Sequence, residues 1–162
     1  MLPPPREPGR YAVALVCLGN ICRSPTAQVV LEERLAEAGL DDRVVVHSSG
    51  TGDWHVGQAM NRRAAATLTG AGYDPSRHRA RQYDDSWLAS HDLVLAMDRE
   101  NLADLGGRSE RVAMFRDFDP GDPGADVPDP YYAGTDIFAE VLTIVERTAD
   151  ALVVELAALP DG

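Results

Sequence analysis

Apolar residues follow two alternating patterns along this chain, short unbroken runs and longer stretches with helical spacing. The run at residues 11–16 is typical of a parallel strand that is buried on both faces. After it, Val30, Leu31 and Leu35 repeat at helical spacing, and Gly39 follows as a stop signal. The same reasoning along the chain predicts strands at 11–16, 43–47, 92–97 and 111–115, and helices at 25–38, 58–69, 85–90, 100–105 and 137–159.

The alternation of strands and helices predicts the α/β class. Four strands joined by helices favour a single-domain, doubly wound, four-stranded parallel sheet with helices on both faces. Ligands of such folds bind beyond the carboxyl ends of the strands. The loop after the first strand is therefore the first place to look for chemistry.

Length and composition agree with one folded unit. The chain has 162 residues, of which 44% are hydrophobic, enough for one buried core. We expect this domain to span 10–162. Residues 1–9 contain four prolines and no apolar segment of a signal peptide, so we expect a disordered lead-in.

The segment 17–25 reads Cys-Leu-Gly-Asn-Ile-Cys-Arg-Ser-Pro, at the point where the first strand gives way to the first helix. A loop of this kind directs backbone N–H groups and the positive end of a helix toward one point, which suits a phosphate dianion. The same field and a nearby guanidinium favour a thiolate, so we expect Cys17 to be a nucleophile. Arg23 can grip two phosphoryl oxygens with its planar fork, which lysine lacks.

The other residues of this loop suit the same purpose. Gly19 and Asn20 tolerate the left-handed backbone region that a sharp curve needs. Ser24 can cap the helix or bond to the Cys17 sulfur, and a proline suits the first helical turn. We therefore expect a phosphate-binding loop after the first strand, with main-chain amides of residues 18–23 as the anion cradle.

Residues 17–25 resemble the signature loop of the low-molecular-weight protein tyrosine phosphatases, particularly the bacterial and actinobacterial members, and the likeness continues along most of the chain. The resemblance implies that Cys17 attacks phosphorus, that Arg23 binds phosphate, and that Asn20 and Ser24 support the loop. It also matches Asp129, in the segment Val-Pro-Asp-Pro-Tyr-Tyr at 127–132, to the general acid of the family.

A carboxyl group such as that of Asp129 can assist both steps of phosphate ester hydrolysis by proton transfer. A phenolate leaving group gains from protonation, and a positioned acid contributes about 10²–10⁴-fold. The same carboxylate can then accept a proton from the water that attacks a phosphocysteine intermediate. Composition alone favours a solvated acidic loop at 117–129, and the resemblance reverses that preference.

Further positions follow from the resemblance. It implies supporting roles for Ser48, His78 and Asp98, with Ser49 only one residue away from the first of these. It also implies a pocket lined by Trp54 and by Tyr131 and Tyr132, together with the loop residues Leu18, Gly19, Asn20, Ile21, Cys22 and Ser24. Apolar side chains among these would equally serve as ordinary packing, which is compatible with walls for a ring-shaped substrate.

Charge and cysteine content limit the partners and the compartment. Fifteen Lys and Arg against 26 Asp and Glu give a net charge of −11, which disfavours nucleic acid and anionic membranes. We expect tyrosine-phosphorylated proteins as substrates, inorganic phosphate as product and competing ligand, and a monomer or weak dimer. Two cysteines and no export signal favour the cytoplasm, although non-standard secretion would leave no trace.

Other interpretations of the loop and its two cysteines agree less well with the sequence. A structural zinc site needs four ligands, and there is no second cysteine pair, so we expect no metal and no cofactor. A Walker loop is excluded because no Gly-Lys-Ser/Thr follows Gly19. Arsenate reductases of this fold use further downstream cysteines, which are missing here. A reversible bond in which Cys22 resolves an oxidised Cys17 stays open.

The sequence therefore predicts a metal-independent protein tyrosine phosphatase that works through a phosphocysteine intermediate. One alternative is a phosphoarginine phosphatase of the same fold, but such relatives tend to carry threonine where this chain has Ile21. The other is a catalytically silent phosphotyrosine-binding module. Hydrolysis of an aryl phosphate distinguishes the enzyme from the module.

Overall fold

The computed structural model describes residues 2–130 and 135–160. Its strands are β1 (Tyr11–Cys17), β2 (Val44–Gly50), β3 (Leu93–Ala96) and β4 (Val112–Met114). They form one parallel sheet in the order β2-β1-β3-β4. The helices are α1 (Arg23–Glu37), α2 (Arg62–Gly70), α3 (Ser86–Ser90), α4 (Arg99–Asp104) and α5 (Thr135–Ala157), with a 3-10 helix at Phe115–Phe118.

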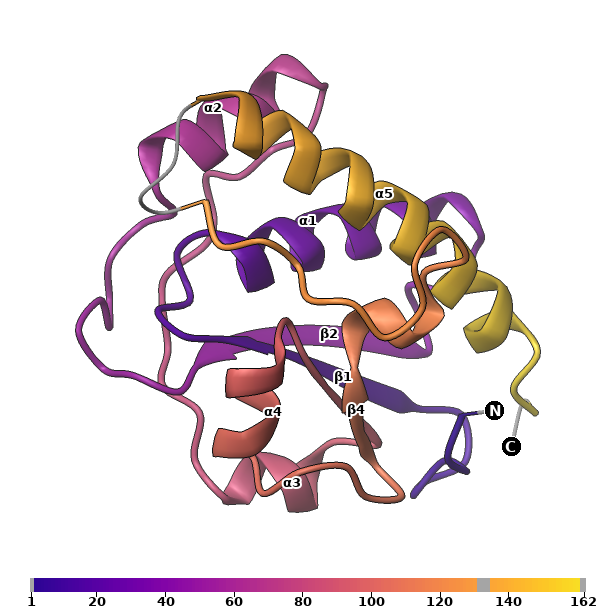
Figure 1. Cartoon of the computed structure of the whole chain (residues 1–162). Coiled ribbons are helices and arrows are strands. Elements are labelled where there is room, and N and C mark those ends of the chain that lie inside the picture. Colours follow the sequence, from indigo (N-terminus) through magenta and orange to yellow (C-terminus); the bar gives the residue numbers. More distant parts are fainter. Residues whose placement is uncertain (1, 131–134, 161–162) are drawn as a thin grey trace.

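Helices cover both faces of the sheet (Figure 1). Helices α1, α2 and α5 lie on one side, and the shorter α3 and α4 lie on the other. The two cores follow the alternation of side chains along β1: Val13 and Leu15 face the larger cluster, whereas Ala14 and Val16 face the smaller one. The expected doubly wound α/β fold with four parallel strands is confirmed.

Most element boundaries lie within two residues of the expected ones, and two of them differ by more. Helix α2 begins at Arg62 rather than at residue 58, because the Asn61 side chain caps it by accepting hydrogen bonds from the amides of Arg63 and Ala64. Strand β2 runs on to Gly50 rather than ending at residue 47, since its last residues still pair with β1 as far as Cys17. This longer strand brings β2 directly beside the phosphate loop.

The disordered lead-in expected at residues 1–9 stays a prediction, and residues 2–9 make defined contacts with the rest of the chain. This segment packs against the end of the sheet, with Leu2 buried in the larger core. The Tyr11 hydroxyl donates to the Pro3 carbonyl at 2.9 Å, and the Arg6 amide donates to Asp92 at 2.7 Å. Prolines already have restricted backbones, so ordering them costs less conformational entropy than ordering most residues.

Candidate active site

The loop between β1 and α1 lies at the carboxyl edge of the sheet, where the fold class places ligands. Strand β1 ends at Cys17, and α1 begins six residues later at Arg23. No side chain caps the N-terminus of α1. The positive end of a 15-residue helix is therefore directed at this loop.

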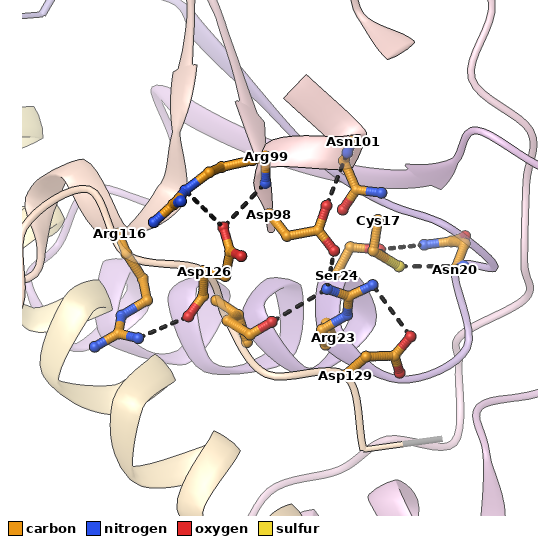
Figure 2. Close-up of polar contacts among 11 residues, drawn as sticks. Cys17, Asn20, Arg23, Ser24, Asp98, Arg99, Asn101, Arg116, Asp126 and Asp129 are labelled. Carbon is orange, nitrogen blue, oxygen red and sulfur yellow. Dashed lines mark hydrogen bonds and ion pairs between the residues drawn. The ribbon is translucent and has the colours of Figure 1, made fainter. Parts of the chain in front are cut away.

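The Cys17 sulfur lies at the base of the loop and is only 3% exposed as a residue. Its Sγ is 2.9 Å from the Ser24 hydroxyl oxygen, and the Asn20 amide donates to it at 3.2 Å. Figure 2 shows the Asn20 amide directed at the sulfur. A thiolate can only accept hydrogen bonds, so with Cys17 in this reactive form both the Ser24 hydroxyl and the Asn20 amide donate to the sulfur and stabilise its negative charge.

Asn20 holds the curvature of the loop. It is fully buried and has a φ of 57°, the one positive φ among the described non-glycine residues. Its Nδ2 donates to the hydroxyls of Ser24 at 2.9 Å and Ser48 at 3.0 Å. Its Oδ1 accepts from the Arg81 amide at 2.9 Å. Both N–H groups of the side-chain amide therefore donate, one to Ser24 in α1 and one to Ser48 in β2, and they link the loop to both elements.

A second layer of contacts supports Asn20 from behind. His78 Nε2 donates to the Asn20 carbonyl at 2.6 Å, which assigns the proton to that ring nitrogen. Burial lowers the pKa of His78, although the bond to the carbonyl opposes the shift. The Ser48 hydroxyl donates in turn to the Gln28 side chain at 2.6 Å. These contacts leave the loop little freedom to relax.

The close packing of β2 against the loop requires Gly50. A Cβ on this residue would lie 2.6 Å from the Leu18 carbonyl oxygen and 3.0 Å from the Asn20 nitrogen. Both are backbone atoms and cannot move aside cheaply. Only glycine lets the strand end approach the loop this closely.

Arg23 lies with its guanidinium buried beside the loop (Figure 2). Its Nη1 donates to Asp98 at 2.6 Å and to the Val127 carbonyl at 3.1 Å. Burial opposes the charge, but the Cys17 sulfur and two aspartates raise the pKa of Arg23 above its usual value. Asp98 fixes the fork on one side and also caps α4 through the Asn101 amide at 2.7 Å. The guanidinium is thus a permanently charged, oriented group.

Asp129 approaches Arg23 from the loop that follows β4. Its Oδ2 lies 3.5 Å from Arg23 Nη2, and its side chain is 43% exposed. The Asp129 carboxylate is directed at Arg23 (Figure 2), and the residue also lines the pocket above the loop. A carboxyl group at this place can exchange a proton with the leaving oxygen of a substrate.

The loop that carries Asp129 is anchored by an ion-pair cluster, which we define as Arg116, Asp119 and Arg147. Asp119 is 1% exposed and receives bonds from Arg147 at 2.7 Å and from Arg116 at 2.9 Å. These arginines lower the pKa of Asp119 well below its ordinary value, against the effect of burial. Arg116 also donates to the Asp126 carbonyl at 2.7 Å, three residues before Asp129.

The pocket above the sulfur has a volume of about 390 Å³. The phosphate loop forms its base, and Leu18 and Trp54, which are 42% and 65% exposed, form part of the rim. The Trp54 ring packs so closely on Gly52 that a Cβ there would lie 1.9 Å from a ring carbon. Such an opening, charged at its base and apolar at its sides, suits a phosphorylated aromatic ring.

Cys22 differs from Cys17 in its surroundings. It is buried at 6% exposure, and its pKa is raised to about 12 by burial, with the Cys17 and Asp129 charges acting in the same direction. It is therefore a neutral thiol at physiological pH. Both cysteines are free in the structure. The resolving role considered for Cys22 stays a prediction.

The structure brings most of the predicted site residues together. Cys17, Arg23 and Asp129 surround one pocket, Ser48 rather than Ser49 bonds to the Asn20 amide, and His78 and Asp98 contact the loop and Arg23. Tyr131 and Tyr132 lie outside the described residues. The remaining predicted pocket residues that line the opening are Leu18, Gly19, Asn20, Ile21, Cys22 and Trp54.

The sequence alone did not predict three residues that help to form the site. Gln28 acts through Ser48, Gly50 allows the close approach of β2, and His55 lines the pocket next to Trp54. Gln28 lies one helical turn after Ser24 on the same helix face, a spacing that could have indicated it. Gly50 and His55 belong to a contact between distant segments, which no local pattern reveals.

Within residues 2–130 and 135–160, no group of three or more His, Cys, Asp or Glu side chains is placed to hold a metal ion. Among the described helices, none combines the length and apolar character needed to cross a membrane.

Comparison with known proteins agrees with this geometry. The model of the family described as low molecular weight phosphotyrosine protein phosphatase matches residues 12–159. The chain belongs to this family. It is 40% identical over 160 residues to the low molecular weight protein-tyrosine-phosphatase of Streptomyces coelicolor, an alignment that covers 94% of this chain and 97% of the relative. It is 45% identical over 145 residues to low molecular weight protein-tyrosine phosphatase A of Mycobacterium tuberculosis, covering 86% and 88% of the two chains.

Solved structures of other family members superpose on most of the chain. A protein tyrosine phosphatase from Entamoeba histolytica with Hepes in its active site gives a TM-score of 0.85 at 30% identity, covering 91% of this chain and 97% of the other. YfkJ from Bacillus subtilis gives a TM-score of 0.85 at 31% identity, covering 91% and 95%. The predicted family and fold of this phosphatase are confirmed.

Proposed function

We propose that this phosphatase hydrolyses phosphotyrosine monoesters in proteins through a phosphocysteine intermediate, with Cys17 as nucleophile, Arg23 as phosphate clamp and Asp129 as general acid and base. One observation supports this above all. A buried sulfur accepts hydrogen bonds at the N-terminus of α1, and a charged guanidinium and a carboxyl group face the same pocket.

In the first step the Cys17 sulfur donates an electron pair to phosphorus, and the bond from phosphorus to the tyrosine oxygen breaks. The leaving oxygen takes a proton from Asp129, so tyrosine departs neutral. Negative charge on the three equatorial oxygens is met by Arg23 and by the backbone N–H groups of residues 18–23. Because Arg23 is already oriented by Asp98 and Val127, no reorganisation is needed when that charge develops.

In the second step water attacks phosphorus and the bond from sulfur to phosphorus breaks. The Asp129 carboxylate takes the proton from this water, which regenerates the acid for the next cycle. Inorganic phosphate leaves, and Cys17 returns as a thiolate that Ser24 and the Asn20 amide stabilise. Inorganic phosphate should then also bind the free enzyme and compete with substrate.

The apolar walls favour an aromatic phosphate. Leu18, Ile21 and Trp54 line the opening above the loop and offer contact to a phenyl ring. We assign supporting roles to the Asn20 side chain and to Ser48 and His78. The Asn20 side chain bonds to Ser48, and His78 bonds to the Asn20 carbonyl, so these contacts act on the conformation of the loop. The same geometry suits a phosphorylated tyrosine better than a flexible guanidino phosphate, because the rim supplies ring surfaces.

The test of this proposal is turnover of para-nitrophenyl phosphate by the intact protein and by Cys17→Ser. We expect a burst of nitrophenol followed by steady hydrolysis for the intact protein, insensitive to chelators, and loss of turnover in the variant. Calorimetric binding of inorganic phosphate to Cys17→Ser checks that the cradle is still folded. Turnover retained in Cys17→Ser would contradict the mechanism, and phosphate binding without hydrolysis by the intact protein would favour the silent binding module.

A further inference from the structure

A second groove adjoins the active-site pocket. It has a volume of about 460 Å³ and shares two walls, Leu18 and Trp54, with the pocket above the Cys17 sulfur. Its other walls come from Tyr83, Asp84 and Asp85, just before α3, and from Asp104 at the end of α4. The groove thus extends the site on the side where Leu18 and Trp54 form the rim.

The charge of this groove is opposite to that of the phosphate loop. All three charged residues that line it are aspartates, and all three are exposed. Burial raises the pKa of the Tyr83 hydroxyl, and the nearby Asp85 and Asp84 charges add to the shift, which reports a negative field at the groove wall. In contrast, the base of the neighbouring pocket carries Arg23 and the N-terminus of α1.

The two aromatic walls narrow the choice of ligand further. Trp54 is 65% exposed and Tyr83 is half-buried, so both offer ring surface to a bound group. Aromatic faces together with carboxylates are typical of a site for a lysine or arginine side chain, which gains from ion pairing and from cation–π contact. An acidic side chain would meet repulsion in the same place.

A peptide chain that carries phosphotyrosine must leave the pocket over its rim. The rim at Leu18 and Trp54 is also the entrance to the groove, so a residue close to the phosphotyrosine can reach it. We propose that this groove is a substrate subsite that binds a lysine or arginine side chain flanking the phosphotyrosine, with Asp85 and Asp104 as its charge-recognising residues. This inference rests on the proposed function and specifies the substrate class of the same site.

Asp85 and Asp104 are suitable positions for substitution, because neither side chain caps the start of a helix. The Asp84 carboxylate accepts bonds from the amide and hydroxyl of Ser86, so it supports the start of that helix. Asp85 makes no such cap, and Asp104 is the last residue of α4. The double variant Asp85→Asn and Asp104→Asn therefore removes two charges from the groove and keeps the size of both side chains.

The test compares phosphotyrosine peptides that differ at one flanking position, with lysine, alanine or glutamate placed in turn from three residues before to three residues after the phosphotyrosine. We expect the intact enzyme to favour lysine over alanine by about 3- to 10-fold in kcat/KM at one or two of these positions, and to disfavour glutamate there. In the double variant the preference should fall to about 2-fold or less. Turnover of para-nitrophenyl phosphate, which has no flanking residues, should be unchanged.

A matched control separates the groove from the overall charge. The variant Glu33→Gln and Glu155→Gln removes the same number of charges from exposed positions outside both pockets. It should keep the preference for lysine. An unchanged preference in the groove variant, or an equal loss in both variants, would overturn the subsite. Failure of the intact enzyme to hydrolyse para-nitrophenyl phosphate would instead contradict the proposed function.

Discussion

The phosphate loop and the rim of the pocket contrast in how they are held. Asn20, Ser24 and Ser48 are fully buried and bonded to one another, and Gly50 presses the end of β2 against them. At the rim, Trp54 and Leu18 are largely exposed, and Asp129 is 43% exposed in its side chain. The loop is thus built for one geometry, whereas the rim can differ in its side chains without disturbing the loop. Under the proposed function, the loop holds the nucleophile and binds phosphate, the apolar rim contacts the substrate ring, and Asp129 acts from the rim on the same reaction.

The largest expected effect on turnover comes from changing Asp129, which belongs to the rim and contacts Arg23. Asp129→Asn should lower kcat for phosphotyrosine by about 10²–10⁴-fold, because the amide cannot protonate the leaving oxygen. The loss should be smaller for aryl phosphates with more acidic phenols, which need less protonation. Steady-state kinetics on a series of substituted phenyl phosphates measures both effects.

The control for this change lies in the same loop. Asp126 pairs with Arg99 and accepts from the Arg99 amide, away from Arg23. Asp126→Asn should therefore alter kcat far less than Asp129→Asn does. A comparable loss in both variants would mean that loop charge, rather than proton transfer, governs the rate.

The next effect tests whether the loop depends on Asn20. Asn20→Ala should lower the free energy of unfolding by about 1–3 kcal/mol, because Ser48 and the Arg81 amide lose a buried partner. Turnover should fall by about 10- to 100-fold as the loop loses its shape. Urea unfolding and para-nitrophenyl phosphate kinetics give the two values.

Asn20→Gly divides this effect into backbone and side-chain parts. Glycine tolerates the φ of 57° without strain but makes none of the side-chain bonds. The Asn20→Gly variant should have a higher free energy of unfolding than Asn20→Ala and a similarly reduced turnover of para-nitrophenyl phosphate. Full activity in Asn20→Gly would show that the hydrogen bonds of this side chain do not shape the loop.

The buried part of the site also carries a dependence on pH. Burial lowers the pKa of His78 below the value of about 6.5 that it has when unfolded. As pH falls below 7, the unfolded chain therefore takes up a proton before the folded one does, and the free energy of unfolding decreases. One histidine contributes at most about 1.4 kcal/mol per pH unit, until the pH passes its folded pKa.

The measurement is urea unfolding at several pH values between 7.5 and 5. His78→Gln keeps a donor for the Asn20 carbonyl and removes the titration, so its stability should vary less with pH. Some dependence should persist, because burial also lowers the pKa values of His47 and His91. An identical slope in the variant and the intact protein would contradict this assignment.

The smallest effect belongs to the rim. Trp54→Ala should lower kcat/KM for phosphotyrosine peptides by about 2- to 10-fold through loss of ring contact, and leave the affinity for inorganic phosphate unchanged. Val56→Ala, at an exposed residue of the same segment, is the matched control and should have little effect. A loss of phosphate affinity in Trp54→Ala would show that rim and loop are not independent.

The sequence predicted the parts of this molecule that depend on local patterns. The alternation of apolar runs and helical spacing along the chain was enough for the fold class, and the segment from Cys17 to Ser24 was enough for the loop. The start of α2 was misplaced because the cap at Asn61 competes with apolar residues before it. The contacts of residues 2–9 carry no local signal, because Arg6 bonds to Asp92, which is distant in the sequence. Gly50 carries no local signal, because its requirement arises from another strand.

The ion-pair cluster of Arg116, Asp119 and Arg147 has a consequence for inherited variation in this enzyme. None of its members lines the pocket, yet Arg116 holds the backbone of Asp126, which lies three residues before Asp129, the proposed proton donor. Exchanging Arg116 for an uncharged residue would leave Asp119 buried without one of its two arginines. Under the proposed function, a chain altered in this way would keep its phosphate loop and still bind phosphorylated ligands, but it would hydrolyse them slowly because Asp129 would be misplaced. A change remote from the pocket would then turn a catalyst into a sequestering agent.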